Sequence, residues 1–310
     1  MLDVLCIGNV CYDQSLYLDY YPEENSKSEI SDILEAGGGP AANAAFLLAK
    51  WGASCAFSGL VGTDFYGEKI ADEFKSVSVD ISVMEQRQDF VTSFSVILVN
   101  RQNGSRTIIN RKQPKGQADR TLLQSLRQPP RMMLFDGHEL EASLEAIRLF
   151  PDAVTVLDAG SLREGTRILA GKVDYLAASE RFALAATGLQ NFDNEADWAN
   201  CLDGLARLCG NHIVVTLGER GLIFKDAKGI CHLPALDVKA LDTTAAGDIF
   251  HGAFVYGLLE NFTLRESLKL ASITAAMSVQ VAGGRQSIPG KDDALDYYAR
   301  NRLLLEIKEI

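Results

Sequence analysis

The sequence has no hydrophobic run long enough to span a membrane and few groups arranged to hold a metal ion. The six cysteines form no CxxC pair, and most lie in apolar stretches, so we expect buried thiols in a reducing compartment. The histidines lack the spacing of a structural zinc site and are His138, His212, His232 and His251. The start, MLDVLCIGNV, has no basic region and only a short apolar run, which disfavours a signal peptide. We therefore expect a cytoplasmic protein.

Basic residues are scarce: 30 Lys and Arg stand against 41 Asp and Glu, for a net charge of −11. Such a charge repels nucleic acid and anionic membranes, so local geometry must hold any anionic ligand. Internal repeats, low-complexity tracts and proline-rich linkers are also missing. The 310 residues, 47% of them hydrophobic, suffice for a sizeable core, and we expect a single domain over 1–310.

Strand-like and helix-like segments alternate along most of the chain. The strand-like runs are 4–8, 54–62, 132–137, 153–160, 172–179, 212–218 and 221–225. This rhythm predicts an α/β fold, a three-layer α/β/α sandwich whose mostly parallel sheet binds ligands beyond the carboxyl ends of its strands. A helix is expected over 41–52, and three more, over 246–260, 264–282 and 291–307, close the chain.

Two stretches interrupt the alternation. Residues 11–36 are too polar for a core, and parts of them alternate like an exposed strand. Residues 91–112 predict a hairpin that turns at Asn103-Gly104. Together they indicate a small sheet projecting as a lid, whose apolar face needs the substrate, the main body or a second subunit as a partner.

The stretch DTTAAGD, residues 242–248, precedes a strongly apolar helix. The N–H groups of a helix's first turn attract anions, and Ala245, Ala246 and Gly247 are small enough to let a phosphoryl group approach them. Asp248 is then placed to take a proton from an attacking hydroxyl. The same residues also fit an ordinary helix cap with an acid in the first turn.

At this point the chain resembles the ribokinase-like, or PfkB, family of carbohydrate and nucleoside kinases. Residues 242–248 and the following Ile249–Phe254 match the family's D-T-x-G-A-G-D signature, except that Ala245 replaces the first glycine. Alanine disfavours positive φ, so this departure predicts a restricted loop or an altered anion nest. The resemblance covers essentially the whole chain in order and implies ATP and Mg²⁺ as cofactors.

A second resemblance concerns the sugar side. The stretch GGGPAANAA, residues 37–45, is similar to the family's other signature, in which Gly38 and Gly39 let backbone lie against a sugar. Asn43 offers a donor and an acceptor to hydroxyl groups. Asp13 stands where members of the family have an Asp that accepts hydrogen bonds from sugar hydroxyls. Each of these residues alone also fits a loop glycine, a helix-end amide or a strand-end carboxylate.

The nucleotide side resembles the family in two segments. TLGERG, residues 216–221, is similar to its nucleotide-binding turn, with Thr216, Gly218 and Gly221 near the phosphates or loop. Residues 279–290 resemble the segment that lines the adenine pocket, including Gly283. The same resemblance implies a monovalent cation, K⁺, held by oxygens of Asp242, Thr244, Gly283 and Ser287.

The family's N-x-x-E motif is missing. Ser179 stands where Asn is expected and Phe182 where Glu is expected. Ketohexokinase-like members also depart here, and CAFSGLVG and SRTIIN resemble them and sulfofructose-kinase-like sugar kinases. MgATP is therefore expected to be held mainly through its own phosphates and water. Ser179 is a candidate for nucleotide contact and equally for the N-cap of the next helix.

The substrate is expected among sugars, with a hydroxyl, preferably primary, of a ketohexose as first choice. Candidate contacts are Arg106 and Asn110 on the hairpin and His138 after a strand; Arg111 or Lys112 would suit an anionic group, though a solvated strand explains them as well. A sulfosugar, keto-deoxy sugar acid, sugar phosphate or nucleoside stays open. The resemblance is weak for the substrate.

Two other classes compete with a kinase. A nicotinamide dehydrogenase requires G-x-G-x-x-G after the first strand, and GNVCYD has a single glycine. A catalytically silent sugar-binding regulator fits the altered motifs, but it needs no base at Asp248. For a kinase we expect a homodimer formed through the lid strands.

Overall fold

The computed structural model describes residues 1–111, 116–209, 211–303 and 305–310. Its largest sheet is mostly parallel. In spatial order the strands are β15 (Lys308–Glu309), β14 (Gly229–Leu233), β13 (Leu222–Asp226), β12 (His212–Thr216), β11 (Tyr175–Ser179), β10 (Val154–Ala159), β9 (Pro130–Phe135), β1 (Leu2–Ile7) and β4 (Cys55–Ser58). The strands from β12 to β4 pair in parallel, whereas β13, β14 and β15 add antiparallel pairs at one edge.

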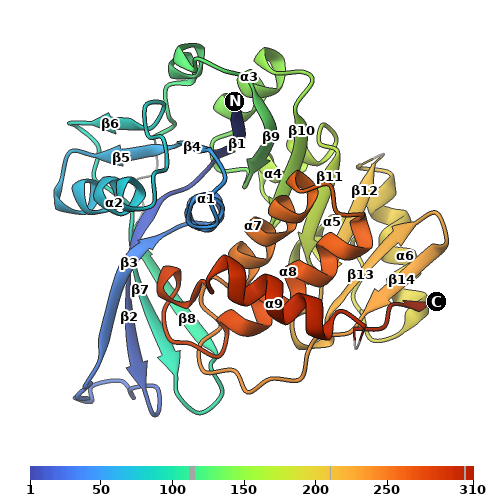
Figure 1. Ribbon diagram of the computed structural model, residues 1–310. Coiled ribbons are helices and arrows are strands. Elements are labelled where there is room, and N and C mark those ends of the chain that lie inside the picture. Colours follow the sequence, from blue (N-terminus) through green and yellow to red (C-terminus); the bar gives the residue numbers. More distant parts are fainter. Residues whose placement is uncertain (112–115, 210, 304) are drawn as a thin grey trace.

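Helices cover both faces of this sheet, as the alternation predicts (Figure 1). Val4 and Cys6 of β1 face one apolar layer, and Leu5 and Ile7 face the other, because successive side chains of a strand point to opposite sides. The first layer contains α1 (Pro40–Lys50), α2 (Phe65–Ser76), α7 (Ala246–Leu259), α8 (Leu264–Ser278) and α9 (Lys291–Asn301). The second contains α3 (Leu140–Leu149), α4 (Glu164–Ala170), α5 (Glu180–Thr187) and α6 (Glu195–Ala206).

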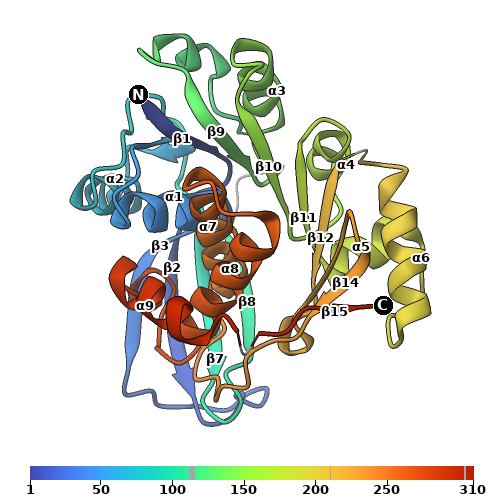
Figure 2. The same ribbon diagram turned by 45° about the vertical axis from the view of Figure 1, so that its right-hand side comes forward.

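A second, four-stranded sheet extends from the body beside the carboxyl ends of the main strands (Figures 1 and 2). Its order is β3 (Ile33–Gly38), β2 (Cys11–Leu18), β7 (Phe94–Asn100) and β8 (Arg106–Arg111), and we call it the lid sheet. β7 and β8 form the expected antiparallel hairpin, and Gly104 in its turn has a φ of 69°. β2 pairs in parallel with β7 and antiparallel with β3, so the lid sheet is mixed.

Three predicted segments are shorter than expected. Residues 54–62 form two strands, because the chain leaves the main sheet at Gly59 and β5 (Leu60–Gly62) pairs instead with β6 (Glu85–Arg87). The helix predicted over 264–282 ends at Ser278, before Gly283, whose φ of 94° is incompatible with a helix. The helix predicted over 291–307 ends at Asn301, and the chain then adds β15 to the sheet edge.

Short 3₁₀ turns complete the structure at Arg120–Ser125, Gly218–Arg220 and Arg285–Ser287. No helix in the described ranges combines the length and the apolar character that crossing a membrane requires. All six cysteines are buried.

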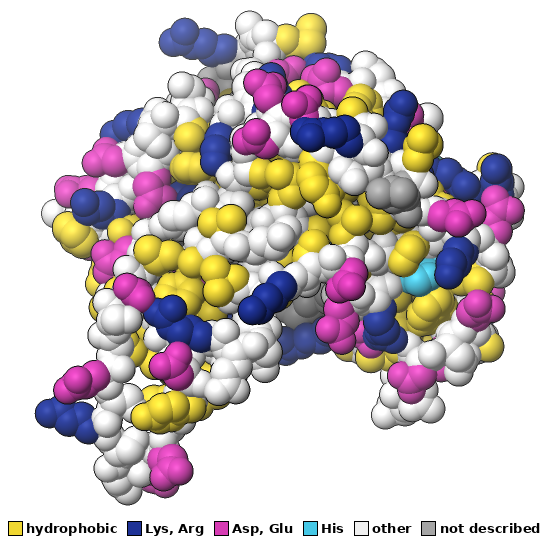
Figure 3. Space-filling view, turned by 60° about the horizontal axis from the view of Figure 1, so that its bottom comes forward, with side chains coloured by type: hydrophobic (Ala, Val, Ile, Leu, Met, Phe, Trp, Pro, Cys, Tyr) yellow, Lys and Arg dark blue, Asp and Glu magenta, His cyan; other side chains and the backbone are white. Residues whose placement is uncertain are grey.

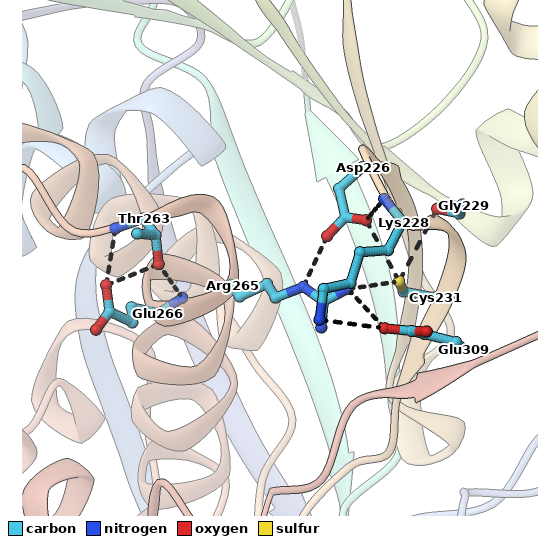
Figure 4. Close-up of polar contacts among 8 residues, drawn as sticks. All are labelled: Asp226, Lys228, Gly229, Cys231, Thr263, Arg265, Glu266 and Glu309. Atoms are coloured by element: carbon cyan, nitrogen blue, oxygen red, sulfur yellow. Dashed lines mark hydrogen bonds and ion pairs between the residues drawn. The ribbon is translucent and has the colours of Figure 1, made fainter.

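Arg265 at the start of α8 ties that helix to the antiparallel edge of the sheet (Figure 4). Its Nε donates to Asp226 Oδ2 at 2.7 Å, and its Nη2 contacts Cys231 Sγ at 3.2 Å and Glu309 Oε1 at 3.5 Å. Burial keeps the Cys231 thiol in its protonated form and raises its pKa. The short C-terminal strand is thereby joined to α8 as well as to β14, which stabilises an edge made of only two residues.

Candidate active site

Helix α7 places its first turn at the carboxyl edge of the main sheet. It is apolar on nearly every side, because it lies between α1 and α8 and over the sheet. Gly252 allows the close approach to α1, since a Cβ there would lie 3.2 Å from Ala44 Cα. The helix begins at Ala246, after Ala245 with φ 60° and ψ 7° in the left-handed region. A Cβ on Gly247 would meet nothing within 4 Å, so the first turn opens into free space.

Asp248 lies in this first turn and is partly exposed. Its Oδ2 accepts a hydrogen bond of 2.7 Å from Asn43 Nδ2 at the start of α1. Desolvation, followed by the nearby Asp158 carboxylate, raises its pKa to about 7, while the Asn43 bond and His251 oppose the rise. A carboxyl group with such a pKa accepts and releases protons near neutral pH, as a general base must.

Asp13 on β2 lies against the glycine-rich strand β3. A Cβ on Gly38 would lie 1.8 Å from Asp13 Oδ2, so a larger residue at that position would displace the Asp13 carboxylate. Asp13 Oδ1 accepts a bond of 3.2 Å from Cys11 Sγ. Burial raises the Asp13 pKa, against the lowering effect of this bond and of Arg285. Gly39, with a φ of 105°, turns the chain into α1 directly above Asn9.

A chain of hydrogen bonds joins Asn43 to a buried arginine that sequence reasoning missed. Arg285 Nε donates to Asn43 Oδ1 at 3.2 Å, and Arg285 Nη1 donates to Glu73 Oε2 of α2 at 2.7 Å. The guanidinium lies between the rings of Phe46 and Phe74, with its Cζ 5.0 and 4.8 Å from their centroids. Both polar ends of the Asn43 amide are therefore engaged, which fixes the orientation of the group that donates to Asp248.

A narrow pocket brings several predicted residues together. Its lining combines Asp13 and Gly37 of the lid sheet, Asn43 of α1, Thr244 before α7, and Gly283 of the segment that follows α8. The other lining residues are Ser15, Leu34, Ala36, Gly284 and Gln286. Segments more than 200 residues apart in the sequence thus meet beside Asp248. Figure 3 shows that the molecule is hollowed beside the projecting lid sheet, with charged side chains of both signs scattered around.

Asp242 connects three parts of the site. Its Oδ2 accepts bonds from Tyr17 Oη at 2.7 Å and from the Gly283 N–H at 2.9 Å, and its Oδ1 accepts from the Thr244 N–H at 2.8 Å. Burial and the Asp242 carboxylate raise the pKa of Tyr17. Ser287 Oγ, also buried, donates to Gly284 O at 2.8 Å. The loop before α7 is thereby fixed to the lid strand β2 and to the segment after α8.

The predicted nucleotide residues divide between two places. Ser179, Thr216 and Gly218 line a pocket of about 890 Å³ between α5 and the end of β12. Ser179 is the N-cap of α5, accepting from the Phe182 N–H at 3.1 Å, and its hydroxyl also donates to Gly160 O. Gly221, with a φ of 90°, packs against Leu233 O and lies outside that lining. Gly283 lines the narrow pocket instead.

Besides Gly38 and Gly39, three further candidate substrate contacts lie outside the pocket lining and have different surroundings. Arg106 is exposed on β8, and its Nη1 donates to Thr243 Oγ1 at 2.9 Å, which joins the hairpin to the loop before α7. Asn110 is also exposed on β8. The His138 ring contacts the Arg163 guanidinium, and the backbone N–H of His138 donates to Asp136 Oδ1. Lys112 lies outside the described residues, and Arg111 donates to Thr92 O at 3.2 Å.

Other titratable groups that sequence reasoning missed lie in the segment between β9 and α3. Asp136 accepts bonds from the N–H groups of Asn9, Ala41 and His138, and burial raises its pKa to about 6. Burial likewise raises the pKa of Glu139 to about 7. The sequence signal for Asp136 was an acid directly after an apolar strand, as in FDG. Across the described part of the chain, His, Cys, Asp and Glu side chains do not gather in groups of three suited to a metal ion.

The left-handed Ala245 yields a stability prediction. Replacing it with glycine removes about 1 kcal/mol of backbone strain. It also raises the conformational entropy of the unfolded chain, which lowers the stability by a comparable amount. We expect Ala245→Gly to keep or slightly raise the free energy of unfolding, by less than about 1 kcal/mol. The matched change Ala246→Gly, at a helical position, should lower it by up to about 1 kcal/mol. Urea unfolding measures both, and equal losses in the two variants would contradict the strain at Ala245.

The fold and the site together define an α/β enzyme that bears a carboxylate at the N-terminus of a buried helix beside a lid sheet. Residues 1–291 match the family described as pfkB family carbohydrate kinase. The chain therefore belongs to the PfkB family, and it is an ATP-dependent sugar kinase, a phosphotransferase with an alcohol group as acceptor.

Two relatives by sequence agree with this assignment, and two solved structures share the fold. The chain is 27% identical over 299 residues to a ribokinase of Lactococcus lactis, covering 93% of this chain and 94% of the relative. It is 26% identical over 311 residues to a deoxyribokinase of Salmonella typhi, covering 97% and 100%. Among solved structures, Thermotoga maritima ribokinase has a TM-score of 0.80 at 23% identity, covering 96% of this chain and 100% of that one. Arabidopsis thaliana ribokinase complexed with ribose and ATP has a TM-score of 0.79 at 20% identity, covering 96% and 98%.

These comparisons correct one expectation. The relatives reported above are ribokinases and a deoxyribokinase, not the ketohexokinases that the resemblance indicated. The segments CAFSGLVG and SRTIIN misled because they form β4, β5 and β8, where strand-forming residues are common in any member of this fold.

Proposed function

We propose that the protein transfers the γ-phosphoryl group of ATP to a hydroxyl, preferably a primary one, of a neutral monosaccharide. The observation that carries this proposal is the meeting of Asp13, Asn43 and the Asp248 region at one narrow pocket. Asp248 takes the hydroxyl proton, the hydroxyl oxygen bonds to the γ-phosphorus, and the bond from that phosphorus to the bridging oxygen of ADP breaks. The first-turn N–H groups at Ala245–Gly247 stabilise the charge on the transferred group.

The charges around the pocket favour a neutral sugar over an anionic one. The Asp13 carboxylate lines it, and the nearest buried cation, Arg285, is already paired with Glu73. A sulfonate, carboxylate or phosphate on the sugar would approach Asp13 without a compensating charge. Ribose and deoxyribose join the ketohexoses as candidates because of the relatives' names. Sugar acids, sulfosugars and nucleosides serve as control substrates in the assay below.

A monovalent cation fits beside the loop before α7. Thr244 Oγ1 is buried and has no hydrogen-bond partner among the described residues, and Asp242 and Ser287 add oxygens nearby. K⁺ prefers such a set of oxygen ligands. Held by Asp242, Thr244, Ser287 and the Gly283 backbone, it would supply a fixed positive charge close to the anion-binding turn. Mg²⁺ would accompany the phosphates of ATP, with Ser179, Thr216, Gly218 and Gly221 on the nucleotide side.

An ATP-consumption screen tests the proposed function. Ribose, deoxyribose, fructose and other ketoses, aldoses, sugar phosphates, sugar acids, a sulfosugar and nucleosides are each offered to the protein with and without K⁺. Turnover of a neutral sugar by the wild type and not by Asp248→Asn supports the proposal. Saturable sugar binding with no turnover in either protein would favour the silent regulator instead, and turnover of anionic sugars alone would contradict the charge argument.

We also propose that two lid sheets pair to form a homodimer. β8 is exposed along its length, and Ile33, Ile108 and Ile109 expose 48%, 46% and 58% of their surface on the lid. Burying these side chains against a second copy would remove them from water. Light scattering should report a dimer for the wild type and a monomer for Ile109→Glu. Leu303→Glu, at an apolar residue exposed outside the lid, is the control and should stay dimeric. A wild-type monomer at micromolar concentration would contradict the pairing.

A further inference from the structure

A buried contact between a histidine and a carboxylate lies close to the proposed base. His251 Nδ1 is 2.8 Å from Asp158 Oδ2, and the two side chains expose 6% and 5% of their surface. Asp158 belongs to β10, near the carboxyl end of a central strand, and His251 belongs to α7. Burying two ionised groups costs several kcal/mol each in desolvation, and apolar residues of similar size would often stabilise the fold as well. The pair therefore calls for a role other than stability.

The position of the pair relates it to Asp248. His251 follows Asp248 by three positions in α7, so both side chains lie on the same helix face. The groups that face Asp248 from other elements are Asn43 of α1, Asp158 of β10 and Arg106 of β8. Arg285 lies behind Asn43, and Asp136 after β9 lies near Asp158. Asp158 is thus an acidic neighbour of the base, and His251 acts on the base in the opposite direction.

The electrostatic effects of the pair on Asp248 have opposite signs. The Asp158 carboxylate raises the pKa of Asp248, and His251 lowers it. Burial lowers the pKa of His251, but the Asp158 carboxylate and then Asp248 outweigh it, so the pKa is raised. The 2.8 Å contact with a buried carboxylate stabilises the protonated imidazole, and the positive charge of that form offsets the carboxylate that would otherwise repel an ionised Asp248.

We propose that His251, held in place by Asp158, is a positioning residue that offsets the Asp158 charge and so helps to keep Asp248 ionised and ready to accept a proton, an inference that rests on the proposed function. Neither residue lines the narrow pocket. The Asp158 carboxylate holds the imidazole as a cation, and the cation balances the negative charge under the first turn of α7. Without His251, Asp158 remains as an uncompensated neighbour of the base.

The test is the pH dependence of kcat/KM between about pH 5 and 9 for the wild type, His251→Asn, Asp158→Asn and the double variant. His251→Asn should move the acid limb upward by about one pH unit, so that activity at pH 6 falls several-fold more than at pH 9. Asp158→Asn should not move it upward, because it removes the repelling charge. In the double variant the upward shift should disappear, since it depends on Asp158.

Several controls separate a charge effect from a structural one. Tyr256→Phe changes a buried polar residue farther along α7 and should leave the limb in place. If His251→Asn does not fold, His251→Gln provides the same test, because its amide still donates to Asp158 without a charge. An unmoved limb in a folded His251 variant, or a shift that persists in the Asp158→Asn background, would overturn the inference.

Failure of this inference is distinguishable from failure of the proposed function. An inactive Asp248→Asn together with an unmoved limb in His251→Asn rejects the ion pair alone. An Asp248→Asn protein with wild-type turnover rejects the base itself, and with it both proposals.

Discussion

Asp248→Asn should lower kcat by at least about 100-fold while leaving the free energy of unfolding almost unchanged. The amide has the shape of the carboxylate but cannot take the proton of an attacking hydroxyl. Its neighbours favour this isosteric change, because Asn43 Nδ2 needs only an acceptor at 2.7 Å and an amide oxygen supplies one. ATP-consumption assays at saturating sugar, with urea unfolding in parallel, measure both quantities.

The pH profile gives the same prediction a second readout. The pKa of Asp248 is raised to about 7, and only the deprotonated form acts as a base. The value of kcat/KM should therefore be constant above this pKa and fall tenfold per pH unit below it. In the Asp248→Asn protein the residual activity should lose this acid limb.

A matched control changes an acid at another helix start. Asp292 lies in the first turn of α9, away from the pocket. Asp292→Asn should keep full turnover and the wild-type pH profile. Equal losses of activity in the two variants, or wild-type turnover in Asp248→Asn, would show that Asp248 is not the base.

Arg285→Met should lower the free energy of unfolding by about 3 kcal/mol. Methionine retains the contact with the Phe46 and Phe74 rings but removes the cation, so Glu73 loses its partner beside the Gly37 backbone. Glu73 is about one-quarter exposed, so water recovers part of its solvation, and we place the loss at the lower end of the range for broken buried pairs. Urea unfolding of the purified variant measures the loss.

The same variant should also lower turnover, because Asn43 loses the donor that fixes its amide orientation. Either orientation of the amide then becomes accessible, and one of them presents an oxygen to Asp248. Adding Glu73→Gln to Arg285→Met should restore part of the stability but none of the turnover, since the amide stays unanchored. If Arg285→Met unfolds at the wild-type urea concentration, the ion pair is not a stabilising element.

Several parts of the site were predictable because they depend on local sequence. The first turn of α7 follows from a small-residue loop before an apolar helix, and the observed helix starts at Ala246 as expected. The hairpin at Gly104 follows from its turn residues. Element ends were less predictable: α8 stops at Ser278, because the chain leaves the helix to bring Gly283 to Asp242. The helix propensity of residues 279–282 does not reveal the contact that Gly283 makes with the distant Asp242.

The sequence by itself determined the α/β class through its periodicity and the kinase family through motifs that resemble those of known members, and it predicted Asp13, Asn43 and Asp248 as site residues. Only the tertiary structure decided which groups surround the base. Arg285 reaches Asn43 across 242 positions of the chain, and Asp158 reaches His251 across two structural elements. Burial makes these charges matter, because a charged group removed from water must find a partner, and the fold rather than the local sequence supplies it.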